Sequence, residues 1–164
     1  AGYTGSIGPR REHNQGHRSW NLSNLIIGSE GTLGILLDAK IRLTPNPKAT
    51  ALCVVHFHSL MDALQAVAPM LEYEPSTIEL LDITFMDEAR INPATRDMSH
   101  FIHGQPQALQ VVEFMADNSE LAQQRATQFA EQLAERGIGW HWPVFSRPSD
   151  IRDVWETRKL GLGL

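Results

Sequence analysis

The order of apolar patterns between residues 51 and 142 constrains the fold of this chain most strongly. Segments with the alternating or continuous apolar pattern of strands are separated by segments whose apolar residues recur at helical spacing. The resulting order is strand, helix, strand, strand, helix, strand, which is that of the split βαβ or ferredoxin-like fold. We therefore predict an α+β domain built on a ferredoxin-like βαββαβ unit.

The boundaries of these elements follow from the same patterns. Strands are predicted at 51–58, 76–85, 108–115 and 138–142, and helices are predicted at 61–72, 86–91 and 119–136. Ser59 is the predicted N-cap of the first helix, because a serine hydroxyl accepts hydrogen bonds from the free amides of a first helical turn. Gly137 is predicted to end the longest helix.

A glycine-rich turn precedes this domain. Gly28, Gly31 and Gly34 recur at a spacing of three in GSEGTLG, which matches neither the dinucleotide-binding nor the Walker pattern. Without a Cβ atom, these residues would let backbone amides approach a flat or phosphorylated ligand closely. A tight turn that leads into an edge strand is the alternative interpretation, and the residues alone favour it.

An alternating pattern follows the turn. In residues 37–43, apolar side chains alternate with Asp, Lys and Arg, which predicts a half-buried strand. Prolines then end this strand, since proline cannot donate to a sheet ladder. The last segment of the chain predicts an amphipathic helix over DIRDVWETRKLGLGL. We divide the chain into an irregular lead-in at 1–20, a segment at 21–48, the ferredoxin-like domain at 49–145 and the start of a following helical segment at 146–164.

Composition and charge exclude several classes of function. The net charge is −5 and no block of like charge occurs, which argues against a nucleic-acid partner. No apolar run reaches the ~18 residues of a membrane span. The single cysteine, Cys53, cannot form an internal disulfide, which fits a reducing, cytoplasmic location. Its place in ALCVVHF predicts a buried small apolar residue rather than a nucleophile.

Two pairs of histidines could in principle chelate a metal ion. His56 and His58 alternate along a strand, and His100 and His103 are three residues apart. Neither pair has an Asp, Glu or Cys neighbour at ligand spacing, so we predict no metal site in this chain.

Three carboxylates lie in predicted strands. For Glu79, Asp82 and Glu113, salt bridges or hydrogen bonds are expected in preference to acid–base catalysis. Glu113 is flanked by Val111, Val112 and Phe114, an apolar setting of the kind in which carboxylate pKa values can shift.

Several of these segments resemble one family of flavoproteins. NLIIGSEGTLGILLDAKIRLTP resembles the end of the FAD-binding domain of vanillyl-alcohol-oxidase (PCMH-type) flavoproteins. Over residues 21–164 the chain resembles FAD-linked oxidases that act on D-2-hydroxy acids, such as D-lactate and D-2-hydroxyglutarate dehydrogenases. It is most similar to the long bacterial members with an iron–sulfur module. The supporting segments are GSEGTLG, FHSLMDAL, PSTIELLD, ALQVVEF and VWETRKLGLGL.

The resemblance implies roles for specific residues. The ferredoxin-like domain is similar to the family's cap, which covers the flavin ring and shapes the substrate pocket. Trp155 and Arg158 match its W-x-x-R element, in which the arginine binds the substrate carboxylate, and Lys159 is a further candidate beside them. The alternative is that Arg158 and Lys159 form the solvated face of an amphipathic helix. The positions implied to contact FAD are Gly28, Ser29, Glu30, Gly31, Thr32, Gly34 and Ile35.

The implied reaction is hydride transfer from the alcohol carbon of a D-2-hydroxy acid to FAD. The family's phosphate-binding glycine loop and its His-Gly-Asp-Gly-Asn motif do not occur in this chain, and no catalytic residue is assigned. We therefore expect a fragment that binds FAD weakly or not at all and does not turn over substrate. An iron–sulfur cluster or a divalent metal would belong to other parts of the longer protein, whose electron acceptor is not specified. That protein would be cytoplasmic, or peripheral at the inner membrane.

A second hypothesis gives the chain a binding or structural role without catalysis. Ferredoxin-like units also serve as small-molecule-binding or oligomerisation modules, which pair through a sheet edge into a homodimer. The terminal helix distinguishes the two hypotheses. Trp155 and Arg158 would line a cleft in the flavoenzyme, and they would pack into a subunit interface in the module.

Overall fold

The structure is a computed structural model that describes residues 23–41, 43 and 46–161. The chain divides into two compact units, Ala1–Thr44 and Pro45–Leu164, and each has its own architecture. The predicted lead-in at 1–20 lies outside the described residues. Among the residues described, no helix is both long and apolar enough to span a bilayer.

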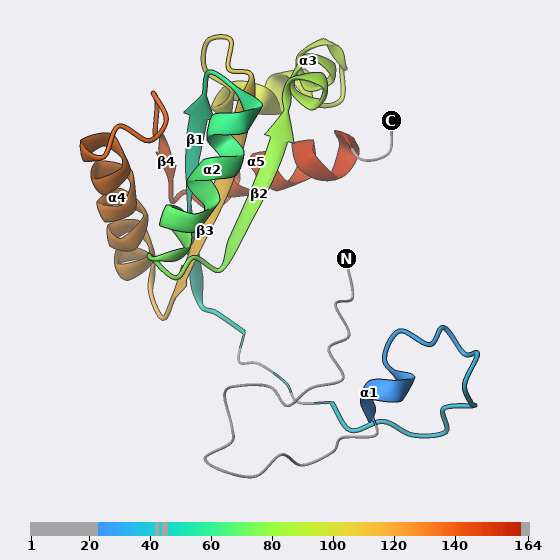
Figure 1. Ribbon diagram of the computed structural model, residues 1–164. Coiled ribbons are helices and arrows are strands. Elements are labelled where there is room, and N and C mark those ends of the chain that lie inside the picture. The colour runs from blue at the N-terminus through green and yellow to red at the C-terminus, as the bar shows by residue number, and fades with distance from the viewer. Residues whose placement is uncertain (1–22, 42, 44–45, 162–164) are drawn as a thin grey trace. The chain divides into compact units, whose positions relative to one another are not determined.

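The larger unit contains a four-stranded antiparallel sheet with the strand order β2-β3-β1-β4 (Figure 1). This order, with helices between the strands, is the predicted ferredoxin-like arrangement. The α+β fold is therefore confirmed. The strands are β1 (Ala49–Phe57), β2 (Thr77–Asp82), β3 (Ala108–Ala116) and β4 (Val144–Phe145).

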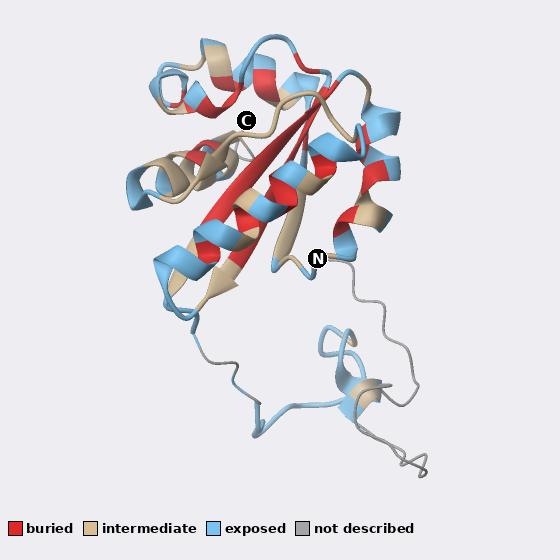
Figure 2. Cartoon of the chain, turned by 90° about the vertical axis from the view of Figure 1, so that its left-hand side faces the viewer, coloured by how far each residue is buried: buried red, intermediate tan, exposed pale blue. Residues whose placement is uncertain are grey.

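Helices cover both faces of the sheet, so the two central strands are buried along most of their length (Figure 2). On one face, α2 (Leu60–Leu71) and α4 (Ser119–Glu135) pack against Cys53, Val112 and Phe114. On the other face, α3 (Ile83–Ile91), the 3-10 helix η1 (Arg96–Phe101) and α5 (Pro148–Gly161) surround Leu52, Val54 and Val111. Burial on both faces explains why residues 51–55 of β1 are continuously apolar.

Local hydrogen bonds set two of the helix starts. The Ser59 side chain accepts from the Asp62 amide at 3.1 Å, which confirms the predicted N-cap of α2. The strand predicted at 76–85 ends earlier, at Asp82. The reason is that the Asp82 carboxylate accepts from the Phe85 amide at 2.9 Å and thereby starts α3 at Ile83.

The strand predicted at 138–142 is wrong in its position. The observed β4 is Val144–Phe145, and before it only His141 forms an isolated bridge, to His56. Gly137 and Gly139 take φ values of +66° and +80°, which no regular strand contains. The chain therefore turns where the apolar pattern predicts a strand.

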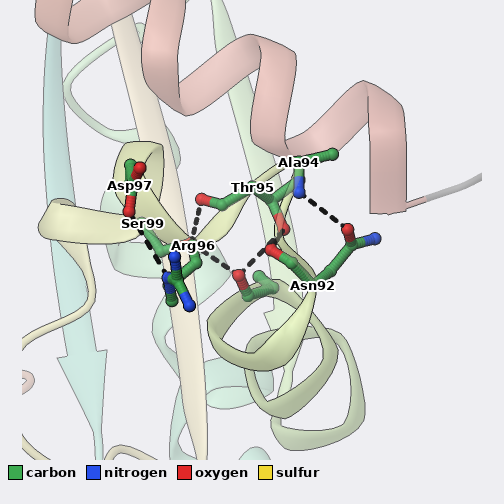
Figure 3. A network of polar contacts seen from close by, with 7 residues as sticks. Asn92, Ala94, Thr95, Arg96, Asp97 and Ser99 are labelled. Carbon is green, nitrogen blue, oxygen red and sulfur yellow. Dashed lines mark hydrogen bonds and ion pairs between the residues drawn. The ribbon is translucent and has the colours of Figure 1, made fainter.

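A buried polar network holds η1 to the end of α3 (Figure 3). The hydroxyls of Thr95 and Ser99 both donate to the carbonyl of Ala89, at 2.8 and 3.0 Å. Ser99 Oγ also lies 2.8 Å from the Thr95 carbonyl, so its single hydroxyl hydrogen is shared between the two acceptors. Because these buried hydroxyls are satisfied within the connection, η1 can pack against α5 without unpaired polar groups.

The smaller unit consists of the short helix α1 (Ser23–Ile26), the glycine turn and an extended segment. The strand predicted at 37–43 is wrong for the residues described there, since none of them is in a strand. Ile35 and Leu37 are 91% and 94% exposed. A strand needs a neighbour for its backbone groups and its apolar face, and no described segment pairs with this one.

Candidate functional site

Helix α5 is fixed by its buried face. Val154 and Thr157 are fully buried, and the Thr157 hydroxyl donates to the Asp153 carbonyl at 2.7 Å. At the end of the helix, Gly161 lies so close to α3 that an added Cβ would stand 2.2 Å from Cε2 of Phe85. These contacts set the rotation of the helix and therefore the direction in which its other side chains point.

The next face of α5 presents Arg158 to the sheet. Its Nε donates to Oε2 of Glu79 at 2.5 Å, across 79 residues of chain. Glu79 lies in β2, and the two side chains are 27% and 37% exposed for Glu79 and Arg158, respectively. This is a partly shielded ion pair between two rigid elements.

Glu113 lies on the same face of the sheet, in β3. It is only 8% exposed, and Thr77 donates to its Oε2 through a long hydrogen bond of 3.5 Å. Burial raises the pKa of Glu113, and the charge of Glu79 acts in the same direction, whereas hydrogen bonds from Thr77 and Trp155 oppose the rise.

The structure thus brings two of the three predicted substrate-binding residues to one site. Trp155 contacts Glu113 and Arg158 contacts Glu79, so that β2, β3 and α5 form what we call the α5–sheet site. Lys159 lies apart from it: its side chain is 75% exposed and stands 3.9 Å from Glu156 of the same helix. Sequence reasoning missed the role of Glu79 as the partner of Arg158. A salt bridge or hydrogen bond was expected for Glu79, but the sequence carries no signal for which residue is its partner.

The predicted cofactor-contacting residues form an exposed turn in the smaller unit. Gly28, Glu30 and Gly31 have φ values of +85°, +50° and +81°, and Thr32 closes the turn by donating its amide and its hydroxyl to the Ser29 carbonyl. The left-handed backbone explains glycine at 28 and 31. The remaining predicted contact positions, Gly34 and Ile35, follow directly and are exposed.

The backbone of this turn is open to a ligand. An added Cβ at Gly28, Gly31 or Gly34 would meet no atom within 4 Å. Among the described residues, the amides of Gly31 and Gly34 have no hydrogen-bond partner. A donor set of unpaired backbone N–H groups without covering side chains fits the polar edge or the phosphates of a nucleotide cofactor.

A second cluster gathers histidines from three segments. His56 is fully buried, its Nδ1 donates to the Val54 carbonyl at 3.1 Å, and its Nε2 accepts from the His103 amide at 3.0 Å. Burial lowers the pKa of His56 to about 4, and the charges of His141 and His103 add to this effect. The rings of His103 and His141 are 4.6 Å apart. In the part of the chain that the structure describes, no group of three or more His, Cys, Asp or Glu residues is placed to hold a metal ion.

The larger unit matches a known protein family. The family model described as "FAD linked oxidases, C-terminal domain" matches residues 46–163. A D-2-hydroxyglutarate dehydrogenase of Escherichia coli (strain K12) is 27% identical over 94% of this chain, and the match covers 16% of that protein. A mitochondrial D-lactate dehydrogenase [cytochrome] of Arabidopsis thaliana is 28% identical over 87% of this chain and 24% of its own length. The chain therefore spans a quarter or less of these relatives.

Proposed function

The chain belongs to the FAD linked oxidases, C-terminal domain family, and from that premise we propose that it is the cap segment of a longer FAD-dependent dehydrogenase for D-2-hydroxy acids. The relatives named above act on D-2-hydroxyglutarate and D-lactate, and both compounds carry a carboxylate beside the alcohol carbon. The proposed partner of this chain is accordingly a small 2-hydroxy acid.

The observation that supports this proposal is the hydrogen bonding of the Arg158 guanidinium. Its Nε is paired with Glu79, while its two terminal amino groups have no partner among the described residues. A guanidinium with its terminal amino groups free binds a carboxylate with two parallel hydrogen bonds and stays charged at every working pH. We assign Arg158 to the substrate carboxylate and Trp155 to the wall beside it. Lys159 stays a further candidate in the same helical turn, although its exposed Nζ lies 3.9 Å from the Glu156 carboxylate and apart from the α5–sheet site.

FAD would be held in part by the exposed turn of the smaller unit. The residues proposed to contact it are those of GSEGTLG and the following Ile35, mainly through the open backbone described above. When bound, FAD supplies the acceptor for the hydride of the alcohol carbon. The group that takes the hydroxyl proton is not assigned to this chain. A divalent metal or an iron–sulfur cluster would be held by other parts of the longer protein.

Within this proposal, the chain's own residues bind and orient. Arg158 fixes the carboxylate end of the substrate, and the apolar body of Trp155 keeps water from that contact. A cytoplasmic location, or peripheral contact with the inner membrane, is part of the proposal for the longer protein.

The test uses the longest protein that contains this chain, purified with FAD. Mixing it without oxygen with D-lactate or D-2-hydroxyglutarate should bleach the flavin absorption, and the L-isomers should not. Arg158→Gln should raise KM for the reactive acid by about two orders of magnitude, because a charged, bidentate contact is lost. A protein whose flavin is reduced by none of these acids would contradict the proposal.

A second candidate function rests on the edge strand β2. Leu80 of β2 is exposed, and so is Leu64 of α2, the helix on the same sheet face. An exposed strand edge with apolar side chains beside it suits pairing with a second copy of the chain. Sedimentation analysis of wild type and Leu80→Lys decides this. A dimer that dissociates in the variant, together with no flavin chemistry, would favour the oligomerisation module.

A further inference from the structure

We infer that Glu79 is a positioning residue, which orients the guanidinium of Arg158 for the carboxylate of the substrate. The inference rests on the function proposed above and adds a residue to it. Its basis is the contact at 2.5 Å between Oε2 of Glu79 and Nε of Arg158.

The nitrogen of Arg158 that Glu79 contacts determines which donors remain for the substrate. A guanidinium has five N–H donors in a fixed plane, and Nε carries one of them. A carboxylate on Nε fixes the plane and direction of the group, and the terminal amino groups keep free donors. In the described part of the chain, these amino groups of Arg158 make no other hydrogen bond or ion pair.

Another ion pair of this chain shows the contrasting arrangement. Arg136 of the α4 C-cap meets Glu72 of the α2 C-cap through its terminal Nη1, at 3.0 Å. The same Nη1 lies 3.4 Å from the hydroxyl of Tyr73. The terminal group of Arg136 is thus used within the fold, and the pair joins two helices. Arg158 is instead held by its inner nitrogen, and this leaves its binding end available.

Both ends of the Glu79–Arg158 contact are mounted on rigid elements. Glu79 is paired with Val111 in the middle of β2. Arg158 follows directly after the buried Thr157, on a helix whose end packs against Phe85. An arginine side chain loses the rotational freedom of its several bonds when it is fixed. Because Glu79 fixes it before substrate arrives, binding does not have to supply that cost.

If the orientation of Arg158 is unimportant, the negative charge of Glu79 leads to the opposite prediction for KM. A carboxylate beside Arg158 offsets its positive charge, so removing it would then strengthen the binding of an anionic substrate. If Glu79 orients Arg158, removing it weakens binding instead. The sign of the change in KM therefore separates the two roles.

The experiment uses the longer flavoprotein with FAD bound, with D-lactate and D-2-hydroxyglutarate as the substrates tested. Glu79→Gln should raise KM by about tenfold with a smaller change in kcat, as expected for a lost charged hydrogen bond. Glu72→Gln is the matched control, because it removes a cross-element ion pair remote from the α5–sheet site. It should leave KM within about twofold of wild type.

A double variant tests whether Glu79 acts through Arg158. In the Arg158→Gln background, Glu79→Gln should have no further effect on KM. If Glu79→Gln lowers KM, matches the control, or adds fully to Arg158→Gln, the inference is overturned. If Arg158→Gln itself leaves KM unchanged, the substrate site proposed above fails as well, so the two failures are distinguishable.

A second variant covers the case in which Glu79→Gln loses flavin or unfolds. Glu79→Asp keeps the charge and withdraws the carboxylate from Nε by one methylene. It should raise KM by about threefold, as expected for a weakened contact. A KM equal to that of wild type for Glu79→Asp would overturn the inference.

Discussion

Nε2 of His56 accepts a hydrogen bond from the backbone amide of His103 at 3.0 Å, although the two residues are 47 positions apart in the chain. The other ring nitrogen, Nδ1, faces the Val54 carbonyl at 3.1 Å and donates to it. This pair of contacts requires the neutral imidazole, because a protonated ring has no acceptor. Histidine 56 thus ties the loop after η1 to the central strand β1 only in its uncharged form.

The first prediction concerns the pH dependence of stability. The pKa of His56 is lowered by burial to about 4, below the ordinary value of 6.5, so the unfolded chain binds more protons than the folded chain between these values. Stability is therefore fully present above pH 6.5 and is lost as the pH falls toward 4, by about 3 kcal/mol. Urea unfolding at pH 7, 5.5 and 4.5 measures this loss.

A matched pair of variants assigns the effect to His56. His56→Gln should reduce the loss between pH 7 and pH 4.5, and His100→Gln, at an exposed position, should leave it unchanged. The lowered pKa of His141 contributes in the same direction and remains in both variants. Equal pH dependence in wild type and His56→Gln would contradict the assignment.

The second prediction concerns Glu113, whose contribution to stability changes with pH in the direction opposite to that of His56. Burial raises the pKa of Glu113 in the folded chain, so this group favours folding at acidic pH and opposes it as the pH rises above the unfolded value of 4.5. Glu113→Gln removes the buried charge and keeps an acceptor for Thr77. Its free energy of unfolding at pH 7 should exceed that of wild type by about 1 kcal/mol. The advantage should shrink at pH 4, and an advantage that is equal at both pH values would refute this explanation.

Local sequence was sufficient for the elements that local contacts define. Ser59 caps α2 as predicted, and the apolar run around Cys53 forms the central strand. The predictions failed where a partner that is remote in the sequence determines the local structure. Residues 37–43 lack a neighbouring strand in the described part of the chain, and the segment near Gly139 turns to meet β1.

The candidate site was likewise predicted only in part from the sequence. Trp155 and Arg158 were identified through a resemblance, and the structure places both on the sheet-facing side of α5. The pairing of Arg158 with Glu79 depends on how α5 crosses the sheet, and a separation of 79 residues carries no signal for it. A tertiary ion pair of this kind is determined by the packing of the folded chain and not by local sequence.

The third prediction concerns Cys53. Its thiol is fully buried between β1 and the α2–α4 layer, and burial raises its pKa far above the ordinary value, as expected for the predicted apolar role. The thiolate is the reactive form, so a thiol reagent such as dithionitrobenzoate should react only when the chain opens. The labelling rate should increase with urea in parallel with unfolding. Rapid labelling of the folded chain would show that Cys53 is accessible.

The fourth prediction concerns FAD and the chain of 164 residues alone. The glycine turn is an exposed surface, whereas cofactor sites enclose most of the surface of their ligand. We expect the isolated chain to purify without the absorption of oxidised flavin at about 450 nm, and added FAD should keep its free fluorescence. Flavin that stays with the chain through gel filtration would disprove this expectation.

The last prediction concerns the turn between α4 and β4. Gly139 has a φ of +80°, and an added Cβ would lie 2.6 Å from Cγ1 of Val55. Gly137 has a similar φ of +66°, but an added Cβ there meets no atom within 4 Å. Gly137→Ala should therefore cost only the backbone strain, about 1 kcal/mol. Gly139→Ala should cost about 3 kcal/mol, because the steric clash with a buried side chain of β1 adds to that strain. Thermal or urea unfolding of both variants gives the difference. Equal losses would mean that the turn moves away from Val55 freely, and the packing of this segment against β1 would then contribute little to stability.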